Sequence, residues 1–230
     1  MFGWGQGSFL PIGVDIGTRS IKLLQLRRRR GQLVLHAAAR AEIAPIEAGA
    51  ERGDSISAAL RKLIAGGFVG RSCVSSLPAK QFHSRSIRLP QMPENERTKA
   101  VMFEAKDRFT FDFDQGRLEH FLAGEARRGT EIRDELLLFA AAGDVLRAHV
   151  ESFTRAGLDL AAIDLQPCAM HRALARVLPS EPGGLQAVID LGVGGTQLFM
   201  MQDDRLVFYK YIEIGADTLH HAVAQKLGVD

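Results

Sequence analysis

The sequence predicts an α/β protein in which one structural unit occurs twice. A short pattern leads to this fold class: an apolar run ends in Asp-Ile-Gly or Asp-Leu-Gly and continues, after a turn of small residues, into a second apolar run. The pattern occurs at residues 12–26 and again at residues 187–201. A third predicted strand and then a helix follow each copy, so the order strand–strand–strand–helix is repeated along the chain.

Composition places the chain among soluble globular proteins. Of its 230 residues, 46% are hydrophobic and 24% are charged, which is typical of a domain that buries a core. A net charge of +2 argues against a nucleic-acid binder driven by bulk electrostatics. No apolar run reaches the roughly 18–20 residues that cross a bilayer, and the N-terminus lacks the features of a signal peptide. Cys73 and Cys168 are isolated, without metal-ligand spacing. We therefore expect a reduced, cytoplasmic protein.

Alternating apolar residues predict the strands that open the first half. These are residues 12–16, 20–28, 33–43, 73–77 and 83–89. Between them, Ile56, Leu60 and Leu63 share one face of a predicted helix over residues 55–65, for which Asp54 is a plausible N-cap. Residues 1–10 are expected to be a flexible lead-in. The run Arg27–Arg30 lies at a predicted turn, where it is either a solvated hairpin tip or a group that attracts anionic lipid.

The remaining elements follow from the same patterns. We predict helices over residues 93–109, 145–156, 167–177 and 217–227, and strands over residues 117–126, 131–141, 158–165, 185–190, 197–202 and 206–214. Residues 180–184, Ser-Glu-Pro-Gly-Gly, are the best candidate for a linker.

The repeated pattern suggests a phosphate site. Glycines allow successive backbone N–H groups to point at one anion, and a carboxylate beside them is useful when Mg²⁺ and its waters lie between it and phosphate. Lys22 would add a point charge. The candidates in the two copies are Asp15, Gly17, Thr18, Ser20 and Lys22, and Asp190, Gly192, Gly194, Gly195 and Thr196. Each glycine turn leads to a strand, whereas the Walker and Rossmann loops lead to a helix.

At these residues the chain resembles the actin and sugar-kinase superfamily. Residues 15–22 look like its first phosphate motif and residues 190–196 like its second, although Val193 stands where actin has an acidic residue. Residues 165–170, Leu-Gln-Pro-Cys-Ala-Met, look like the start of its connecting helix. The resemblance implies an actin-like ATPase fold, a ribonuclease H-like duplicated βββαβαβα. It also implies that Gln166 orients the attacking water, so that Asp15, Asp190 and Gln166 form the catalytic set, with both aspartates near Mg²⁺.

Within the superfamily the chain is similar to the type IV pilus assembly protein PilM family, relatives of the division protein FtsA. The likeness rests on residues 13–26, on Ser-Ile-Arg-Leu-Pro at 86–90 with the acidic helix after Pro93, and on residues 136–164. It implies a cytoplasmic scaffold at the inner face of the inner membrane, which binds ATP and Mg²⁺ and is at most a slow ATPase.

The family also implies the partners of the protein. It binds the N-terminal peptide of a PilN-like inner-membrane protein in pilus assembly or a related secretion system. Further expectations are a contact with the pilus motor ATPase, peripheral association with the membrane through partners, and a homo-oligomer. No nucleic-acid partner is expected.

The resemblance implies a division of the chain. Residues 11–90 and 142–180 would form the first actin-like subdomain, and residues 91–141 would form the inserted small α+β subdomain typical of PilM and FtsA. Residues 181–230 would begin the second actin-like domain. Because the family continues beyond this point, with its nucleotide-base pocket, we expect the second half to be incomplete and the chain to be truncated at its C-terminus.

A different class of function stays open, namely the N-terminal part of a small-molecule, sugar-type kinase of the same superfamily. Such an enzyme needs a general base beside the acceptor hydroxyl. Asp107, Asp112 and Asp114 are the candidates, in a charged and aromatic stretch that is more typical of a solvated loop.

Overall fold

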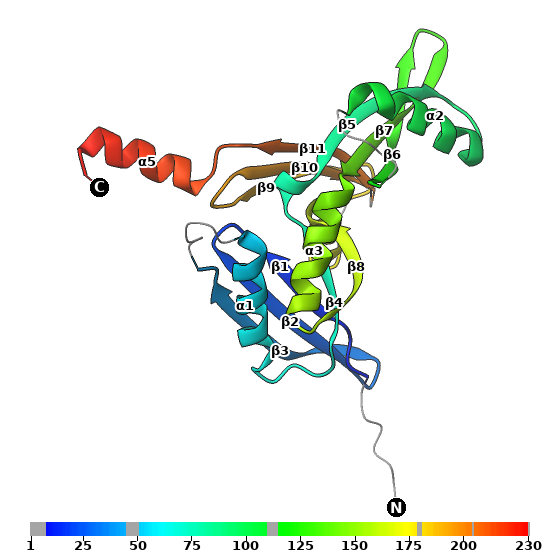
Figure 1. The fold of residues 1–230 in the computed structure, drawn as a ribbon. Helices are drawn as coiled ribbons and strands as arrows, with labels where there is room; N and C mark the ends of the chain where they lie inside the picture. The colour runs from blue at the N-terminus through cyan, green and yellow to red at the C-terminus, as the bar shows by residue number, and fades with distance from the viewer. Residues whose placement is uncertain (1–7, 45–50, 110–114, 179–180, 204, 230) are drawn as a thin grey trace, which may run out of the picture. The chain divides into compact units, whose positions relative to one another are not determined.

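The structure, a computed structural model, describes residues 8–44, 51–109, 115–178, 181–203 and 205–229 (Figure 1). The chain forms two compact units. The first consists of Met1–Leu77 with Arg147–Asp164, and the second of Pro78–Leu146 with Leu165–Asp230.

A five-stranded sheet forms the first unit, in the order β3-β2-β1-β4-β8. Its strands are β1 (Ile12–Ile16), β2 (Ser20–Arg29), β3 (Gln32–Glu42), β4 (Ser72–Leu77) and β8 (Asp159–Leu165). β1 is antiparallel to β2 and parallel to β4. The three predicted N-terminal strands are therefore present, and the first Asp-Ile-Gly lies where β1 ends.

Two helices cover one face of this sheet, α1 (Arg52–Ile64) and α3 (Gly143–Arg155). Ile12, Val14 and Ile16 of β1 pack with Leu60 of α1 and Phe153 of α3 in one buried cluster. Burying a side chain of this size contributes about 1.5–3 kcal/mol. The alternating apolar residues of β1 and the helically spaced apolar residues of α1 thus pack in one core.

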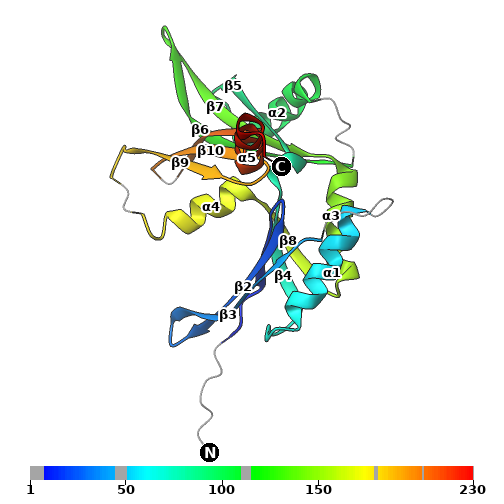
Figure 2. The ribbon, with the colours of Figure 1, turned by 90° about the vertical axis from the view of Figure 1, so that its left-hand side faces the viewer.

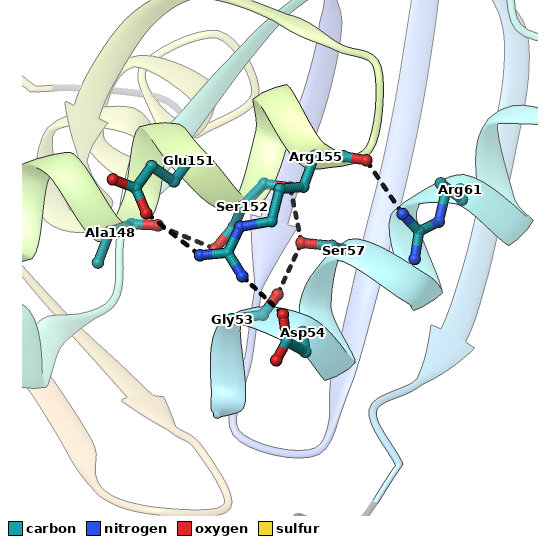
Figure 3. A network of polar contacts seen from close by, with 8 residues as sticks. All are labelled: Gly53, Asp54, Ser57, Arg61, Ala148, Glu151, Ser152 and Arg155. Atoms are coloured by element: carbon teal, nitrogen blue, oxygen red, sulfur yellow. Dashed lines mark hydrogen bonds and ion pairs between the residues drawn. The ribbon is translucent and has the colours of Figure 1, made fainter. Parts of the chain in front are cut away.

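Polar contacts join α1 to α3 (Figure 3). The buried Ser57 Oγ lies 2.7 Å from the carbonyl oxygen of Gly53 and 2.9 Å from that of Ser152. Arg61 donates to the carbonyl of Arg155, and the Arg155 guanidinium pairs with Asp54 at 2.6 Å. These contacts fix α1 against α3. Asp54 is therefore not the predicted N-cap: α1 begins at Arg52 with Glu51 as N-cap, and Asp54 lies in its first turn.

One sheet of the second unit has the strand order β5-β7-β6. The strands are β5 (His83–Pro90), β6 (Arg117–Arg128) and β7 (Glu131–Ala141), and a short 3-10 helix, η1 (Ala79–Gln81), precedes them. Helix α2 (Glu94–Arg108) packs Val101 and Ala105 against Leu136 and Leu138 of β7. The Arg97 guanidinium pairs with the buried Asp134 carboxylate at 3.0 Å.

The other sheet of this unit contains the second copy of the pattern. Its order is β11-β10-β9, from β9 (Leu185–Leu191), β10 (Thr196–Gln202) and β11 (Arg205–Ile212), with helices α4 (Gln166–Leu174) and α5 (Ala216–Leu227) in the same unit. The rings of Phe82, Phe139 and Tyr209 pack together, with centroids 5.5–5.8 Å apart. This aromatic cluster connects β11 with β7.

The borders of the two units differ from the predicted division of the chain. Because β5 pairs with β7 over its whole length, residues 83–90 group with the segment predicted as an insertion. α4 groups with the second unit and ends at Leu174 rather than near residue 177. The predicted lead-in lies outside the described residues over 1–7, whereas Phe9 forms a bridge with Arg27.

Candidate phosphate-binding turns

The first turn, Gly17–Ser20, joins β1 to β2 and is closed by a hydrogen bond from the Gly17 N–H to the Ser20 carbonyl at 2.9 Å. Asp15 lies opposite Lys22 in the two strands, and the Lys22 ammonium donates to the Asp15 carboxylate at 2.9 Å. Both side chains are accessible, 44% for Asp15 and 60% for Lys22. The predicted carboxylate and cation are thus side by side at the strand end, where water and a ligand can reach them.

Arg52, the first residue of α1, holds this turn. Its Nη2 donates to the carbonyls of Gly17 and Thr18 at 3.0 and 3.1 Å. A trans peptide directs its N–H opposite to its C=O. The N–H groups of Thr18 and Arg19 are therefore directed away from Arg52.

The second turn, Gly192–Gly195, joins β9 to β10 and is closed in the same way, from the Gly192 N–H to the Gly195 carbonyl at 3.0 Å. Here the start of α5 takes the place of Arg52. The N–H groups of Ala216 and Asp217 donate to the carbonyls of Gly192 and Val193, each at 3.0 Å. The N–H groups of Val193 and Gly194 are consequently directed away from α5.

Tyr211 restricts one position of the second turn to glycine. Its hydroxyl donates to the Gly194 carbonyl at 3.0 Å, and a Cβ added at Gly195 would collide with the Tyr211 ring and hydroxyl. A Cβ at Gly215 would likewise collide with the turn backbone. The requirement is one of space rather than of backbone angle, since neither glycine has a positive φ.

The two turns share one arrangement of backbone dipoles. In each, protein donors hold two successive carbonyls, so that two successive N–H groups are directed to the other side. Such an arrangement is suited to an anion. Different groups achieve it, an arginine in the first unit and a helix N-terminus in the second.

Asp190 belongs to a hydrogen-bonded network around the buried Gln197. Gln197 Nε2 donates to Asp190 Oδ2 at 3.1 Å and lies 3.3 Å from Gln166 Oε1. The Tyr209 hydroxyl donates to Gln197 Oε1 at 3.1 Å. Burial, followed by the nearby Tyr211, Asp190 and Cys168, raises the pKa of Tyr209, so this hydroxyl remains a donor. Gln197 thus joins two predicted site residues, Asp190 and Gln166.

The other predicted site residues differ in their contacts and burial. Gln166 Oε1 also accepts a hydrogen bond from the Ala79 N–H at 3.0 Å. Thr196 donates its hydroxyl to the Ile214 carbonyl at 2.6 Å, so this donor is already committed within the protein. Ser20 is buried. The first copy, with Asp15, and the second, with Asp190, lie in different compact units.

Sequence reasoning missed Arg52, Gln197 and Tyr211. Gln197 had a signal: it follows Asp190 by seven residues, as Lys22 follows Asp15, and each pair is directly cross-strand. Aligning the two copies on their aspartates would have found it. Arg52 and Tyr211 carry no local signal, because they reach the turns only through folding.

For the alternative kinase site, Asp107 lies exposed in the last turn of α2, whereas Asp112 and Asp114 lie outside the described residues. Within the described ranges, no group of three or more His, Cys, Asp or Glu side chains is placed to hold a metal ion. None of the helices described is long and apolar enough to span a membrane.

Comparison with known proteins identifies the family. The model of the family named type IV pilus assembly protein PilM matches residues 13–230. The chain belongs to this PilM family.

Solved structures agree on the fold. A PilM-PilN type IV pilus biogenesis complex superposes with a TM-score of 0.78 at 21% identity, covering 96% of this chain and 66% of that one. The ethanolamine utilization protein EutJ of Carboxydothermus hydrogenoformans gives 0.54 at 15% identity, covering 98% and 59%.

A Bacteroides thetaiotaomicron protein of unknown function, described as having an actin-like ATPase fold, gives 0.50 at 6% identity, covering 96% and 77%. The fold of this PilM-family chain is therefore the predicted actin-like ATPase fold. The chain spans 66% of the chain that it matches in the PilM-PilN complex.

Proposed function

We propose that this chain is the phosphate-binding part of a nucleotide-binding, PilM-type scaffold for type IV pilus assembly, located in the cytoplasm at the inner face of the inner membrane. Its output is a contact with the N-terminal peptide of a PilN-like membrane protein, and hydrolysis is slow or absent. The observation that carries this proposal is that each turn directs two successive N–H groups to one side, away from the groups that hold its carbonyls.

The residues present fit ATP with Mg²⁺. Thr18 and Arg19 in one turn, and Val193 and Gly194 in the other, direct N–H groups to the side away from the groups that hold their carbonyls. Lys22 supplies a cation for phosphate. Asp15 and Asp190 supply oxygen ligands for Mg²⁺ or its waters, which is how this ion is commonly held beside phosphates. Mg²⁺ would neutralise phosphate charge when bound.

Gln197 has a supporting role in this proposal. Its amide donates to Asp190 and its carbonyl accepts from Tyr209, which fixes the orientation of the carboxylate. Gln166 would orient water, as the family resemblance implies. Its Oε1 is oriented by the Ala79 N–H.

The partner is proposed from the family and from the complex that the fold matches. That structure contains PilM with PilN, and a contact of this chain with a PilN-like peptide is the corresponding proposal. Contacts with the motor ATPase and self-association are further proposals from the same resemblance.

Calorimetry with Mg·ATP tests nucleotide binding. Asp15→Ala and Asp190→Ala should each weaken binding about tenfold to a hundredfold, as expected for a charge-assisted contact of about 1.5–3 kcal/mol. Asp159→Ala and Glu181→Ala are matched controls, since these carboxylates lie in the same two units but at the strand ends opposite to the turns. Undiminished affinity in both Asp15→Ala and Asp190→Ala would refute the phosphate site.

A peptide titration separates the scaffold from the kinase. A PilN-type peptide of the Asn-Leu-Leu-Pro kind should bind the protein, and the two aspartate variants should leave that binding measurable without nucleotide. Absence of peptide binding together with sugar-dependent ADP release would favour the small-molecule kinase instead.

A further inference from the structure

The far end of the β2–β3 hairpin concentrates positive charge. We call residues 26–36, Leu-Arg-Arg-Arg-Arg-Gly-Gln-Leu-Val-Leu-His, the arginine hairpin. It contains four arginines and no acidic residue. In the described part of the chain, no carboxylate forms an ion pair with Arg27–Arg30. The phosphate-turn proposal does not use these side chains.

The arginine hairpin is a well-defined structure rather than a loose loop. Arg29 pairs with Gln32, so two residues form the turn. Both of them, Arg30 and Gly31, have positive φ, 52° and 81°, as the tight turn that matches strand twist requires. A third segment supports the hairpin, since the Leu10 N–H donates to Leu26 and the Arg28 N–H donates to Ser8.

One face of the hairpin combines arginine with aliphatic side chains. Arg28 lies opposite Leu33, and Leu26 lies opposite Leu35, and cross-strand pairs two residues apart share a face. Leu33 is 41% exposed and Leu35 is 60% exposed. Arg28, Arg29 and Arg30 are also exposed. Arg28 therefore lies beside the uncovered leucines, while Arg29 lies on the opposite face and Arg30 in the turn.

The arginine hairpin lies at the opposite end of β2 from the first phosphate turn. Ser20 begins β2 and Arg29 ends it. At about 3.3 Å per residue, nine steps separate them by roughly 30 Å. Figure 2 shows the hairpin extending beyond the other strands of its sheet. A large surface can therefore contact the hairpin without reaching the phosphate turn.

We propose that the arginine hairpin docks directly on an anionic lipid bilayer. Guanidinium groups pair with phosphate in a fork geometry, and aliphatic side chains next to them gain by entering the headgroup region. A nucleic acid duplex would match the arginines, but its accessible backbone is charged and gives Leu33 and Leu35 no apolar layer to enter. The net charge of the whole chain, only +2, confines the attraction to this tip.

Vesicle co-sedimentation of the 230-residue chain without a partner protein tests the proposal. Binding is expected to vesicles of phosphatidylcholine with phosphatidylglycerol and not to phosphatidylcholine alone. The variant Arg28→Gln, Arg29→Gln, Arg30→Asn should bind about a hundredfold more weakly, since each arginine near an anionic surface contributes about fivefold. Asparagine suits the positive φ at position 30, so the unfolding midpoint should not fall.

Two comparisons make the test decisive. The control Lys62→Gln, Lys106→Gln, Lys210→Gln removes the same charge from exposed positions elsewhere and should bind almost as tightly as the parent. Leu33→Ser, Leu35→Ser should weaken vesicle binding and leave binding to a short DNA duplex unchanged. An equal loss of vesicle binding in the arginine and lysine variants would overturn the proposal. So would a leucine variant that loses DNA binding and keeps its vesicle binding.

Discussion

Replacing Gly195 by alanine tests how the second turn is built. The added Cβ would overlap the Tyr211 ring, and the ring cannot move without breaking its hydroxyl contact with the Gly194 carbonyl. Overpacking of this kind costs about 1–3 kcal/mol, and the lost hydrogen bond adds about 1 kcal/mol. We therefore expect the free energy of unfolding of the second unit to fall by about 2–4 kcal/mol.

Urea unfolding followed by circular dichroism measures this change, and a thermal melt should shift by about 2–4 °C per kcal/mol. Gly124→Ala is the matched control. Gly124 also lies in a strand of the second unit, has no positive φ, and has open space where its Cβ would be. It should change stability by less than about 0.5 kcal/mol.

A rescue identifies the cause. In a Tyr211→Ala background, Gly195→Ala should cost less than about 0.5 kcal/mol, because the colliding ring is gone. In a Tyr211→Phe background the full cost should remain, since the collision involves ring carbons as well as the hydroxyl. The reasoning is refuted if Gly195→Ala costs the same in the alanine and phenylalanine backgrounds.

Three other predictions concern different parts of the molecule. Burial lowers the pKa of His149 to about 4, so this side chain stays neutral in the folded state while it gains a proton below about pH 6.5 in the unfolded state. The free energy of unfolding should therefore fall by about 3 kcal/mol between pH 6.5 and 4. Urea titrations at both pH values should show a smaller fall for His149→Gln. Arg52→Leu should weaken Mg·ATP binding about fivefold in calorimetry, because the first turn loses the donor to its carbonyls. An unchanged affinity would mean that Arg52 does not contribute to the binding site. Ile189 and Leu191 are 70% and 57% exposed on β9, so light scattering should show that the chain self-associates. The double variant Ile189→Thr, Leu191→Thr should self-associate less, and a stable monomer of the unchanged chain would contradict the expectation.

Much of the fold followed from periodicity. The strands near Asp15 and Asp190 were predicted within a residue or two, since apolar alternation and glycine turns mark their ends. The start of α1 was placed too late, because the side chain of Asp54 contacts Arg155 across 101 residues instead of capping its own helix. Similarly, the pairing of β5 with β7 was not predicted, because nothing local in the sequence reveals it.

Residue type and spacing alone predict that the chain carries two copies of one hairpin, each with an aspartate where its first strand ends. Those features are local, so spacing and residue type were sufficient to predict them. The groups that hold each turn are visible only in the folded chain. Arg52 reaches the first turn from 34 residues away or more, and the start of α5 with Tyr211 holds the second. These contacts join residues distant in the chain, and their geometry exists only once the helices and strands have packed.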